Sequence, residues 1–434
     1  MQISIEARQR AQALLDFIDA SPSPWHAVTH IEKTLTAQGF QKLSEQNAWQ
    51  TQAGGKYFVI RDGGSIIAFV RGSGDTTNNG FRIVGAHTDS PGLRLKPKAA
   101  YSTEGIGQLG VEVYGGPILA TFTDRDLSLA GRVTVKTATG FDTHLVKLDQ
   151  PVARLPNLAI HMNREVNDKG LALNKQTGLP LIFGHAANSD TARQLLSDTL
   201  AHTLQIAGSD IISWDLALYD TQTGSFWGIA QEFIADSQLD NLASCHAALE
   251  ALLSTGNPQA TCICALFDHE EVGSESATGA GGSFLLDVMT RLCHAEQLTE
   301  EDKLRSYAQS FFISADMAHA FHPNHAGSYE PCHHVQVNQG PVIKTNANQR
   351  YSTDAITAAR FIQLCEQAGV PCQQYAHRTD LGCGSTIGPI MAAQLGIATV
   401  DVGNPMWAMH SIRESAGVLD HSYMIAALQQ HYRS

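Results

Sequence analysis

The 434-residue sequence has little that would direct it to a membrane or a nucleic acid. Its N-terminal segment mixes charged and apolar residues at helical spacing, so it lacks the continuous apolar core of a signal peptide. No later apolar run is long enough to span a bilayer. Acidic residues outnumber basic ones by 42 to 29, and the net charge of −13 repels phosphate backbones and anionic lipids. We therefore expect neither a nucleic acid nor a membrane as a partner.

Disulfide signals and low-complexity tracts are also missing. The eight cysteines form no CxxC pair and are too sparse for a disulfide framework, so we expect reduced thiols and a cytoplasmic protein. A chain of this length is long for one hydrophobic core, which favours two domains.

The pattern of apolar residues indicates an α/β protein. Helical periodicity covers residues 5–20, a second helix follows the Pro-rich turn and ends at Gly39, and residues 56–72 form a hairpin around Gly63. Apolar strands then alternate with helices, which predicts a mostly parallel sheet flanked by helices. Residues 94–222 differ, because short β-like runs are separated by Gly, Asp and Asn. We predict a discontinuous catalytic domain, 1–93 and 223–434, and an inserted β-rich domain, 94–222.

Candidate metal ligands stand where apolar strands give way to loops. The carboxyl ends of parallel strands share one edge of a sheet, so ligands from remote segments can meet there. Two more candidates precede a helix or follow a late strand. The residues are His87 and Asp89, Glu270 and Glu271, Asp316, Asp240 and His410.

Each candidate also has an ordinary structural interpretation. His87 and Asp89 share one side of an extended chain, so the carboxylate could orient the imidazole, but a core histidine before a turn gives the same pattern. Glu270 and Glu271 repel one another unless a cation compensates, although a solvated pair is the alternative. Asp240 could simply cap a helix. Asp316 could be a loop acid, and His410 a packed histidine.

Taken together, these segments resemble the M18 family of metallo-aminopeptidases, which includes aspartyl aminopeptidase. The matching stretches occur in the family's order between residues 85 and 417. They include GAHTDSPGLRLKP, NLAIHMNREVN, DSQLDNLAS, FDHEEVGSESATGA, ISADMAHAFHPN, GPVIKTNANQRYSTDA, CGSTIGPI and MHSIRESAG. The resemblance implies a zinc-peptidase catalytic domain and an inserted dimerisation domain.

The resemblance also implies a role for each candidate. His87 and Asp316 would hold one metal ion, Glu271 and His410 the other, with Asp240 bridging. Glu270 would be the general base and Asp89 the partner that orients His87. A cis peptide is expected at Asp240–Asn241. The implied substrate-binding residues are His319, Lys344, Tyr351 and His161, the last from a neighbouring subunit or as an extra metal contact.

The implied activity is removal of the N-terminal residue of a peptide, with a preference for Asp or Glu. A hydroxide held by two divalent ions would attack the peptide bond. The mixed nitrogen and oxygen ligands suit Zn²⁺, with Co²⁺ or Mn²⁺ as substitutes. Family members form dimers and commonly dodecamers, so a homo-oligomer is expected. The alternatives are a dinuclear zinc deacylase or carboxypeptidase, and a metal-binding assembly protein without turnover.

Overall fold

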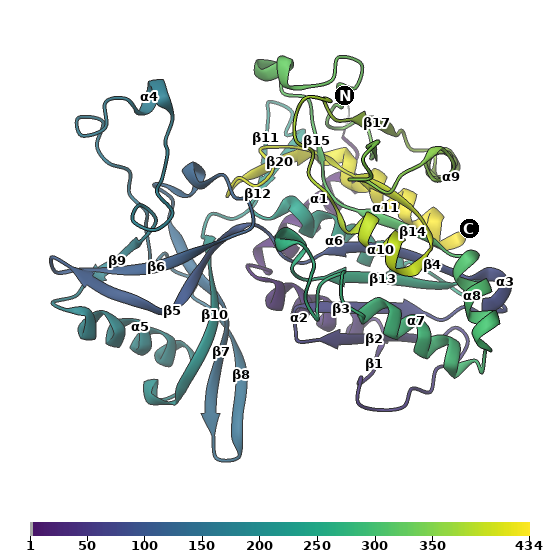
Figure 1. The fold of residues 1–434 in the computed structure, drawn as a ribbon, viewed down its shortest axis with the longest axis horizontal. Coiled ribbons are helices and arrows are strands. Elements are labelled where there is room, and N and C mark those ends of the chain that lie inside the picture. Colours follow the sequence, from purple (N-terminus) through teal and green to yellow (C-terminus); the bar gives the residue numbers. More distant parts are fainter. Residues whose placement is uncertain (1–2) are drawn as a thin grey trace.

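In the computed structural model, which describes residues 3–434, a nine-stranded sheet forms the centre of the larger lobe (Figure 1). Its four central strands, β13, β4, β14 and β18, run parallel. In spatial order the strands are β1 (Gln41–Lys42), β2 (Lys56–Arg61), β3 (Ser65–Val70), β13 (Thr261–Phe267), β4 (Phe81–His87), β14 (Phe311–Ala315), β18 (Ala398–Gly403), β16 (Val342–Thr345) and β17 (Gln373–Ala376).

Helices cover both faces of this sheet, which explains why its central strands are apolar almost throughout. One face packs against α1 (Ile5–Asp19), α2 (Pro24–Ala37), α6 (Leu239–Leu253), α9 (Ala355–Ala368) and α11 (Val418–Arg433). The other packs against α7 (Phe284–Ala295), α8 (Glu300–Ala308) and α10 (Ile387–Leu395). The predicted α/β class with a largely parallel sheet is confirmed.

The N-terminal elements follow from local sequence signals. Ser4 caps α1 and Ser23 caps α2, and Pro24 occupies the first turn of α2, where its missing N–H costs nothing. The predicted hairpin is the antiparallel pair β2 and β3. Among residues 3–434, no helix is both long and apolar enough to cross a membrane.

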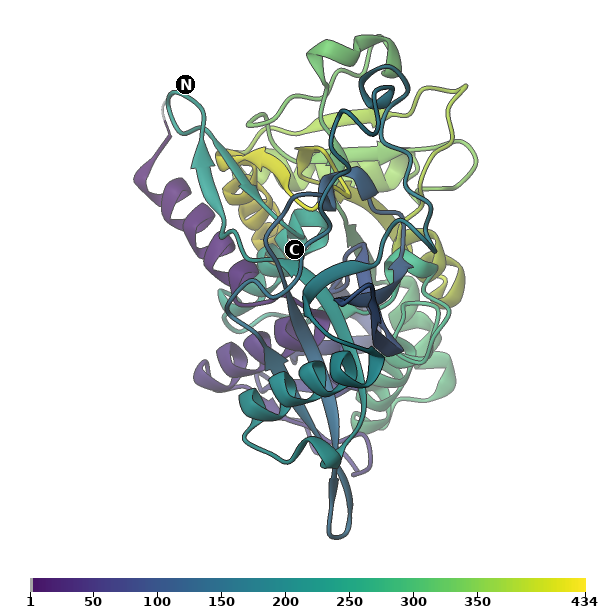
Figure 2. The same cartoon turned by 90° about the vertical axis from the view of Figure 1, so that its left-hand side faces the viewer.

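A second, six-stranded antiparallel sheet forms the smaller lobe, which faces the viewer in Figure 2. It has its own apolar core, to which α5 (Ser189–Leu204) contributes Ala192, Leu196 and Leu200. The i, i+4, i+8 spacing of these three residues was a helical signal that the β-rich prediction passed over. In spatial order the strands are β8 (Gly140–Lys147), β7 (Leu127–Thr137), β10 (Ile211–Asp220), β5 (Gly92–Thr103), β6 (Ile106–Tyr114) and β9 (Leu181–His185).

An arm of residues 156–180, which contains α4 (Val166–Lys169), extends from this lobe (Figure 1). Its apolar side chains are exposed: Leu158 by 63% and Met162 by 73%. The domain boundaries at 93/94 and 222/223 stay a prediction.

A small five-stranded sheet lies beside the larger one and carries the loop that contains His410. Its spatial order is β11 (Ser225–Trp227), β12 (Phe233–Asp236), β20 (Glu414–Gly417), β19 (Pro405–Trp407) and β15 (Ala318–His319). The remaining elements are α3 (Thr76–Asn79) and the 3₁₀ turns η1 (Leu119–Phe122), η2 (Gly208–Asp210), η3 (Glu270–Val272) and η4 (Pro323–Ser328).

Candidate metal centre

The ends of three neighbouring parallel strands carry acidic or imidazole side chains to one place. His87 is the last residue of β4, Asp316 directly follows β14, and η3 with Glu270 and Glu271 follows β13. His87 is paired in register with Phe267, the last residue of β13. The structure therefore brings these remote segments together at one edge of the sheet, where the sequence placed them.

Asp240 and His410 complete the cluster from outside the strand ends. Asp240 lies in the first turn of α6, and the Asp240–Asn241 peptide is cis, as predicted. The side-chain amide of Asn241 donates to the backbone carbonyl of Ala315 at 2.9 Å, and this bond connects α6 to the end of β14. His410 lies in the loop between β19 and β20.

The donor atoms form two groups that share Asp240. In the first group His87 Nε2 lies 3.6 Å from Asp240 Oδ1 and 3.5 Å from Asp316 Oδ1. In the second group His410 Nε2 lies 3.5 Å from Asp240 Oδ2 and 3.4 Å from Glu271 Oε1. Each oxygen of Asp240 therefore faces a different group, as a bridging carboxylate would.

These separations fit metal coordination better than direct hydrogen bonding. Ordinary N–H···O bonds measure about 2.7–3.2 Å, whereas two ligands of a tetrahedral zinc, each about 2.1 Å from the ion, lie roughly 3.4 Å apart. Asp240 Oδ1 is buried and has no hydrogen-bond partner among the described residues. Each group offers three protein donors, the number that catalytic zinc sites use.

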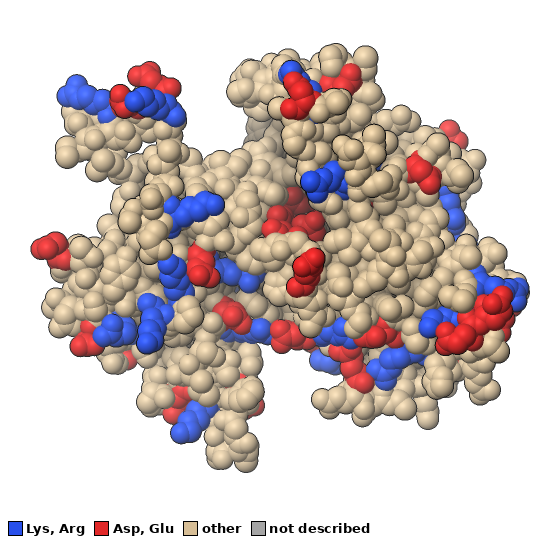
Figure 3. Space-filling view, viewed as in Figure 1, with Lys and Arg blue, Asp and Glu red and all other residues tan. Residues whose placement is uncertain are grey.

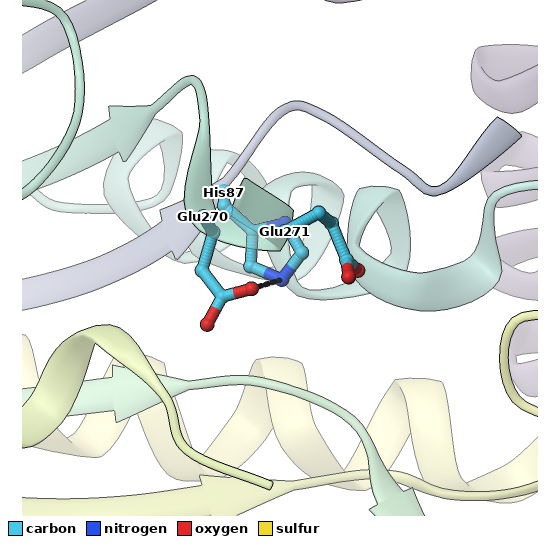
Figure 4. A group of neighbouring side chains, drawn as sticks. All are labelled: His87, Glu270 and Glu271. Atoms are coloured by element: carbon cyan, nitrogen blue, oxygen red, sulfur yellow. Dashed lines mark ion pairs between the residues drawn. The ribbon is translucent and has the colours of Figure 1, made fainter. Parts of the chain in front are cut away.

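Glu270 and Glu271 point to different sides of the His87 ring (Figure 4). Glu270 Oε2 lies 3.9 Å from His87 Nε2, while Glu271 faces His410. A third possible donor group contains His87, Glu270 and Glu271, so position alone is compatible with Glu270 as ligand or as base. The first two groups, however, each reach three donors without Glu270, and this leaves its carboxylate available for proton transfer.

Burial and mutual repulsion dominate the electrostatics of the acids. Desolvation, together with the negative charge of neighbours such as Asp316, raises the pKa of Glu270 to about 9. Desolvation likewise raises the pKa of Glu271 to about 7 and raises that of Asp240. Burial opposes the charge on His410, yet the nearby carboxylates of Asp240 and Glu271 raise its pKa to about 11. Several carboxylates that lie close together in a site with little water favour a bound cation.

Asp89 is buried behind the ligands and organises the loop that carries both glutamates. Its carboxylate accepts the backbone N–H of Glu270 at 3.0 Å and that of Glu271 at 3.1 Å. The Nδ1 of His87 lies 3.0 Å from the backbone carbonyl of Asp89 and 3.5 Å from its carboxylate. The main acceptor for the ring is therefore the backbone carbonyl, and the carboxylate acts chiefly on the glutamate loop. Both contacts leave His87 Nε2 free for a metal.

A cavity of about 800 Å³ opens over the donor groups. Figure 3 shows acidic side chains at the bottom of a recess on this face. Three predicted substrate-binding residues, His319, Lys344 and Tyr351, line it. Lys344 is buried, and its ammonium donates to the carbonyls of Asp316 at 2.9 Å and Met317 at 3.0 Å.

His161 is the predicted site residue that the structure does not bring to the centre. It lies exposed on the arm and is not among the residues that line the cavity in the described chain. A role at the metal centre of its own chain is therefore not supported by its position.

Glu414 supports the site but was missed in the sequence. Its buried carboxylate accepts the backbone N–H of Asp240 at 2.9 Å and that of His410 at 2.6 Å. It thus holds the main chain at two of the proposed ligands. The only signal was its place in the MHSIRESAG stretch, and the pairing with Asp240 depends on a contact 174 residues away.

The sequence matches a family model and several named proteins. The family model described as "Aminopeptidase I zinc metalloprotease (M18)" matches residues 17–432. The protein named "Probable M18 family aminopeptidase 2" from Ectopseudomonas mendocina is 48% identical over 426 residues, covering 98% of each chain. Its namesake from Stutzerimonas stutzeri is 47% identical over the same length and coverage.

Solved structures show the same fold. The chain matches Ape4 in its complex with Nbr1 with a TM-score of 0.93 and 39% identity, over 100% of this chain and 88% of the other. It matches mApe1 from Chaetomium thermophilum with a TM-score of 0.89 and 31% identity, over 98% and 97%. The family match over nearly the whole length, together with the acid-rich centre, shows that the chain belongs to the M18 family of zinc metallo-aminopeptidases.

Proposed function

We propose that the chain uses two divalent metal ions, for which Zn²⁺ suits the donor set best, to remove the N-terminal residue of peptides. The observation that supports this is the shared carboxylate of Asp240, which faces a separate three-donor group on each side. His87, Asp240 and Asp316 would hold one ion, and Asp240, Glu271 and His410 the other. Ions bound there would acidify a water molecule and polarise the scissile carbonyl.

Glu270 is the general base in this proposal, in which the bound cations would offset the burial and the negative neighbours that raise its pKa. Its carboxylate takes a proton from the attacking water and later gives it to the departing amine. Hydrogen bonds from the backbone to Asp89 hold the loop that carries Glu270, so the base is positioned before the substrate arrives.

We propose that Lys344 favours substrates with an N-terminal Asp or Glu. Its buried ammonium lines the cavity and uses two of its three protons on backbone carbonyls. Its charge also faces the carboxylate of Asp316, with Nζ 3.7 Å from Oδ2. In surroundings poor in water the ammonium would still attract an acidic substrate side chain beside it. His319 and Tyr351 line the same cavity and would contact the substrate beside it.

The arm supports an oligomeric assembly. A solved structure of mApe1 from S. cerevisiae, 28% identical to this chain, is that of a dodecamer. We propose a dimer-based homo-oligomer, a dodecamer in its complete form, in which residues 94–222 form the dimerisation domain. His161 of the exposed arm would then reach the cavity of a neighbouring subunit and contact substrate. All eight cysteines are free, and this supports the proposed cytoplasmic location.

The substrate class can be tested with short peptides. The zinc-loaded enzyme should release the first residue of peptides with a free N-terminus, and acetylation of that amine should abolish release. Cleavage that depends instead on a free C-terminal carboxylate would indicate a carboxypeptidase, and removal of the acetyl group would indicate a deacylase. Zinc binding with no hydrolysis of any of these substrates would indicate an assembly protein.

The acidic preference requires a separate comparison. Asp-, Glu- and Leu-derived substrates should be compared by kcat/KM under one set of conditions. Higher values for Asp and Glu are expected, and faster cleavage of the Leu substrate would contradict the proposed role of Lys344.

A further inference from the structure

The carboxyl end of β6 belongs to the six-stranded sheet, yet it contacts the metal centre of the other lobe. Tyr114 is the last residue of β6, and Gly115 and Gly116 follow it. We refer to residues 114–116 as the β6 end. Its contacts reach two different parts of the centre, the glutamate loop and the loop of His410.

The first contact acts through Asp89. The hydroxyl of Tyr114 donates to Asp89 Oδ2 at 2.7 Å, and the same oxygen accepts the backbone N–H of Glu271. The guanidinium of Arg94 lies 3.5 Å from the centroid of the Tyr114 ring and holds it from the other side. Tyr114 is only 9% exposed, so water does not readily replace its hydroxyl.

The second contact acts on His410 directly. Its Nδ1 lies 3.0 Å from the carbonyl oxygen of Gly116. A carbonyl can only accept, so Nδ1 keeps its proton when the ring is neutral, and the Nε2 lone pair is then free to bind a metal. Ile118, two residues further on, donates its N–H to the carbonyl of His410 at 2.8 Å.

The third feature is a close approach that only glycine allows. Gly115 has φ +67°, and a Cβ at this position would lie 3.2 Å from both the Cβ and the backbone oxygen of Glu271. The absent side chain therefore lets the β6 end pack directly against the glutamate loop.

We propose that the β6 end completes the metal centre from the six-stranded sheet. It orients His410 through Gly116 and the glutamate loop through Tyr114 and Asp89. Metal affinity and turnover consequently depend on how the smaller lobe is seated against the larger one. This inference rests on the proposed dinuclear function. Tyr114 is a positioning residue in it, since it touches neither the substrate nor the proposed metals.

The first test is Tyr114→Phe, which removes one hydroxyl. Partners of ligating groups typically change metal affinity or activity by about 10–100-fold when mutated, and Tyr114 acts one contact further out, through Asp89. We therefore expect the lower end of that range: kcat and the Zn²⁺ affinity of the apo-protein should each fall about tenfold, and KM should change by less than about twofold. Affinity is measured by competition with a chromogenic chelator. Tyr219→Phe is the matched control, because its hydroxyl donates to the carbonyl of Leu148, within the smaller lobe, at 2.7 Å.

The second test is Gly115→Ala, compared with Gly105→Ala. Gly105 has φ +81° in the turn between β5 and β6, but a Cβ there would contact nothing within 4 Å. Both variants carry similar backbone strain, so a difference in Zn²⁺ affinity reports the contact with Glu271. We expect Gly115→Ala to bind Zn²⁺ at least about tenfold more weakly than Gly105→Ala. Thermal unfolding of all four variants shows that they are folded.

The outcomes separate this inference from the proposed function. If Tyr114→Phe and Gly115→Ala match their controls in Zn²⁺ affinity and kcat, the β6 end has no positioning role and the inference is wrong. If the wild-type protein hydrolyses no peptide but the two variants still bind Zn²⁺ more weakly than their controls, the proposed function fails while the positioning role holds.

Discussion

The two lobes are both rich in strands, but they place polar side chains differently. In the larger lobe the central strands are parallel and end at one edge, and the proposed metal ligands from remote segments meet there, buried or half-buried. In the smaller lobe the strands are antiparallel, and successive strand ends lie at opposite edges. To the metal centre it contributes the β6 end, through the hydroxyl of Tyr114, the carbonyl of Gly116 and the close backbone approach at Gly115. It also carries the exposed arm.

The difference between the two sheets indicates which of them can hold a cluster of charged groups and which can only orient such a cluster. Charged groups that must act together need a shared edge and burial, which the parallel sheet supplies. The antiparallel sheet instead orients the groups of the metal centre through contacts from the other lobe. The following experiments test that division of roles.

The largest expected effect is that of Glu270→Gln. The amide cannot accept a proton from water, so turnover should fall roughly 10³-fold, within the range for loss of a general base. Bound zinc, measured by elemental analysis, should stay at the wild-type ratio, because each donor group keeps its three ligands. Glu275→Gln, an exposed change in the same loop, is the control. Normal turnover in Glu270→Gln would remove Glu270 from the reaction.

The next effect is loss of stability in acid, confined to the larger lobe. His246 and His421 are buried with 2.9 Å between Nδ1 and Nε2, and His431 is buried against Phe311. Desolvation lowers the pKa of His246 to about 4 and the pKa of His421 and His431 well below the ordinary value.

The sign of the pH dependence follows from these lowered pKa values. Above pH 6.5 the histidines are neutral in both folded and unfolded chains. As the pH falls from 6.5 to 4, the histidines of the unfolded chain bind protons, whereas the same histidines in the folded chain stay neutral. The lower pH therefore favours the unfolded state. His246 alone should reduce the free energy of unfolding by about 3 kcal/mol. Hydrogen exchange between pH 7 and 4 should show α6 and α11 losing protection before β7 and β10. Earlier loss in the smaller lobe would contradict this order.

A smaller effect is expected for Lys344→Met. Removing the ammonium should lower kcat/KM for Asp and Glu substrates by about 10–150-fold relative to a Leu substrate, since a charge-assisted hydrogen bond contributes about 1.5–3 kcal/mol. Some loss on every substrate is also expected, because Lys344 donates to the carbonyls of Asp316 and Met317. The ratio between substrates is therefore the measurement. An unchanged ratio would place the acidic specificity elsewhere.

The smallest signal, a partial recovery of activity on mixing two variants, tests whether the arm serves a second subunit. His161→Ala and Glu270→Gln are each expected to be nearly inactive alone. Random reassortment into dimers gives half mixed pairs with one intact site each, so a mixture should recover roughly a quarter of wild-type activity. Unmixed variants treated in the same way are the control. A mixture no more active than its parents would show that His161 does not serve a neighbouring site.

Much of the centre could be predicted because it follows from local signals. His87, Asp316 and the two glutamates each stand after an apolar run, and parallel strand ends share an edge. The α5 helix was not predicted, although its apolar residues have helical spacing, because most of the segments around it in residues 94–222 have the short apolar runs of β-strands. Glu414 could not be assigned, since nothing near it in sequence indicates the backbone that it holds.

By itself, the sequence determined the fold class, the family and the chemical types that gather at the centre, because periodicity and strand-end motifs are local properties. Only the tertiary structure decided that each oxygen of Asp240 faces a different donor group and that Tyr114 reaches Asp89 from the other lobe. It also decided that His161 lies away from its own cavity. These are distances between remote segments, and they are set by how the sheets and helices pack rather than by neighbours along the chain.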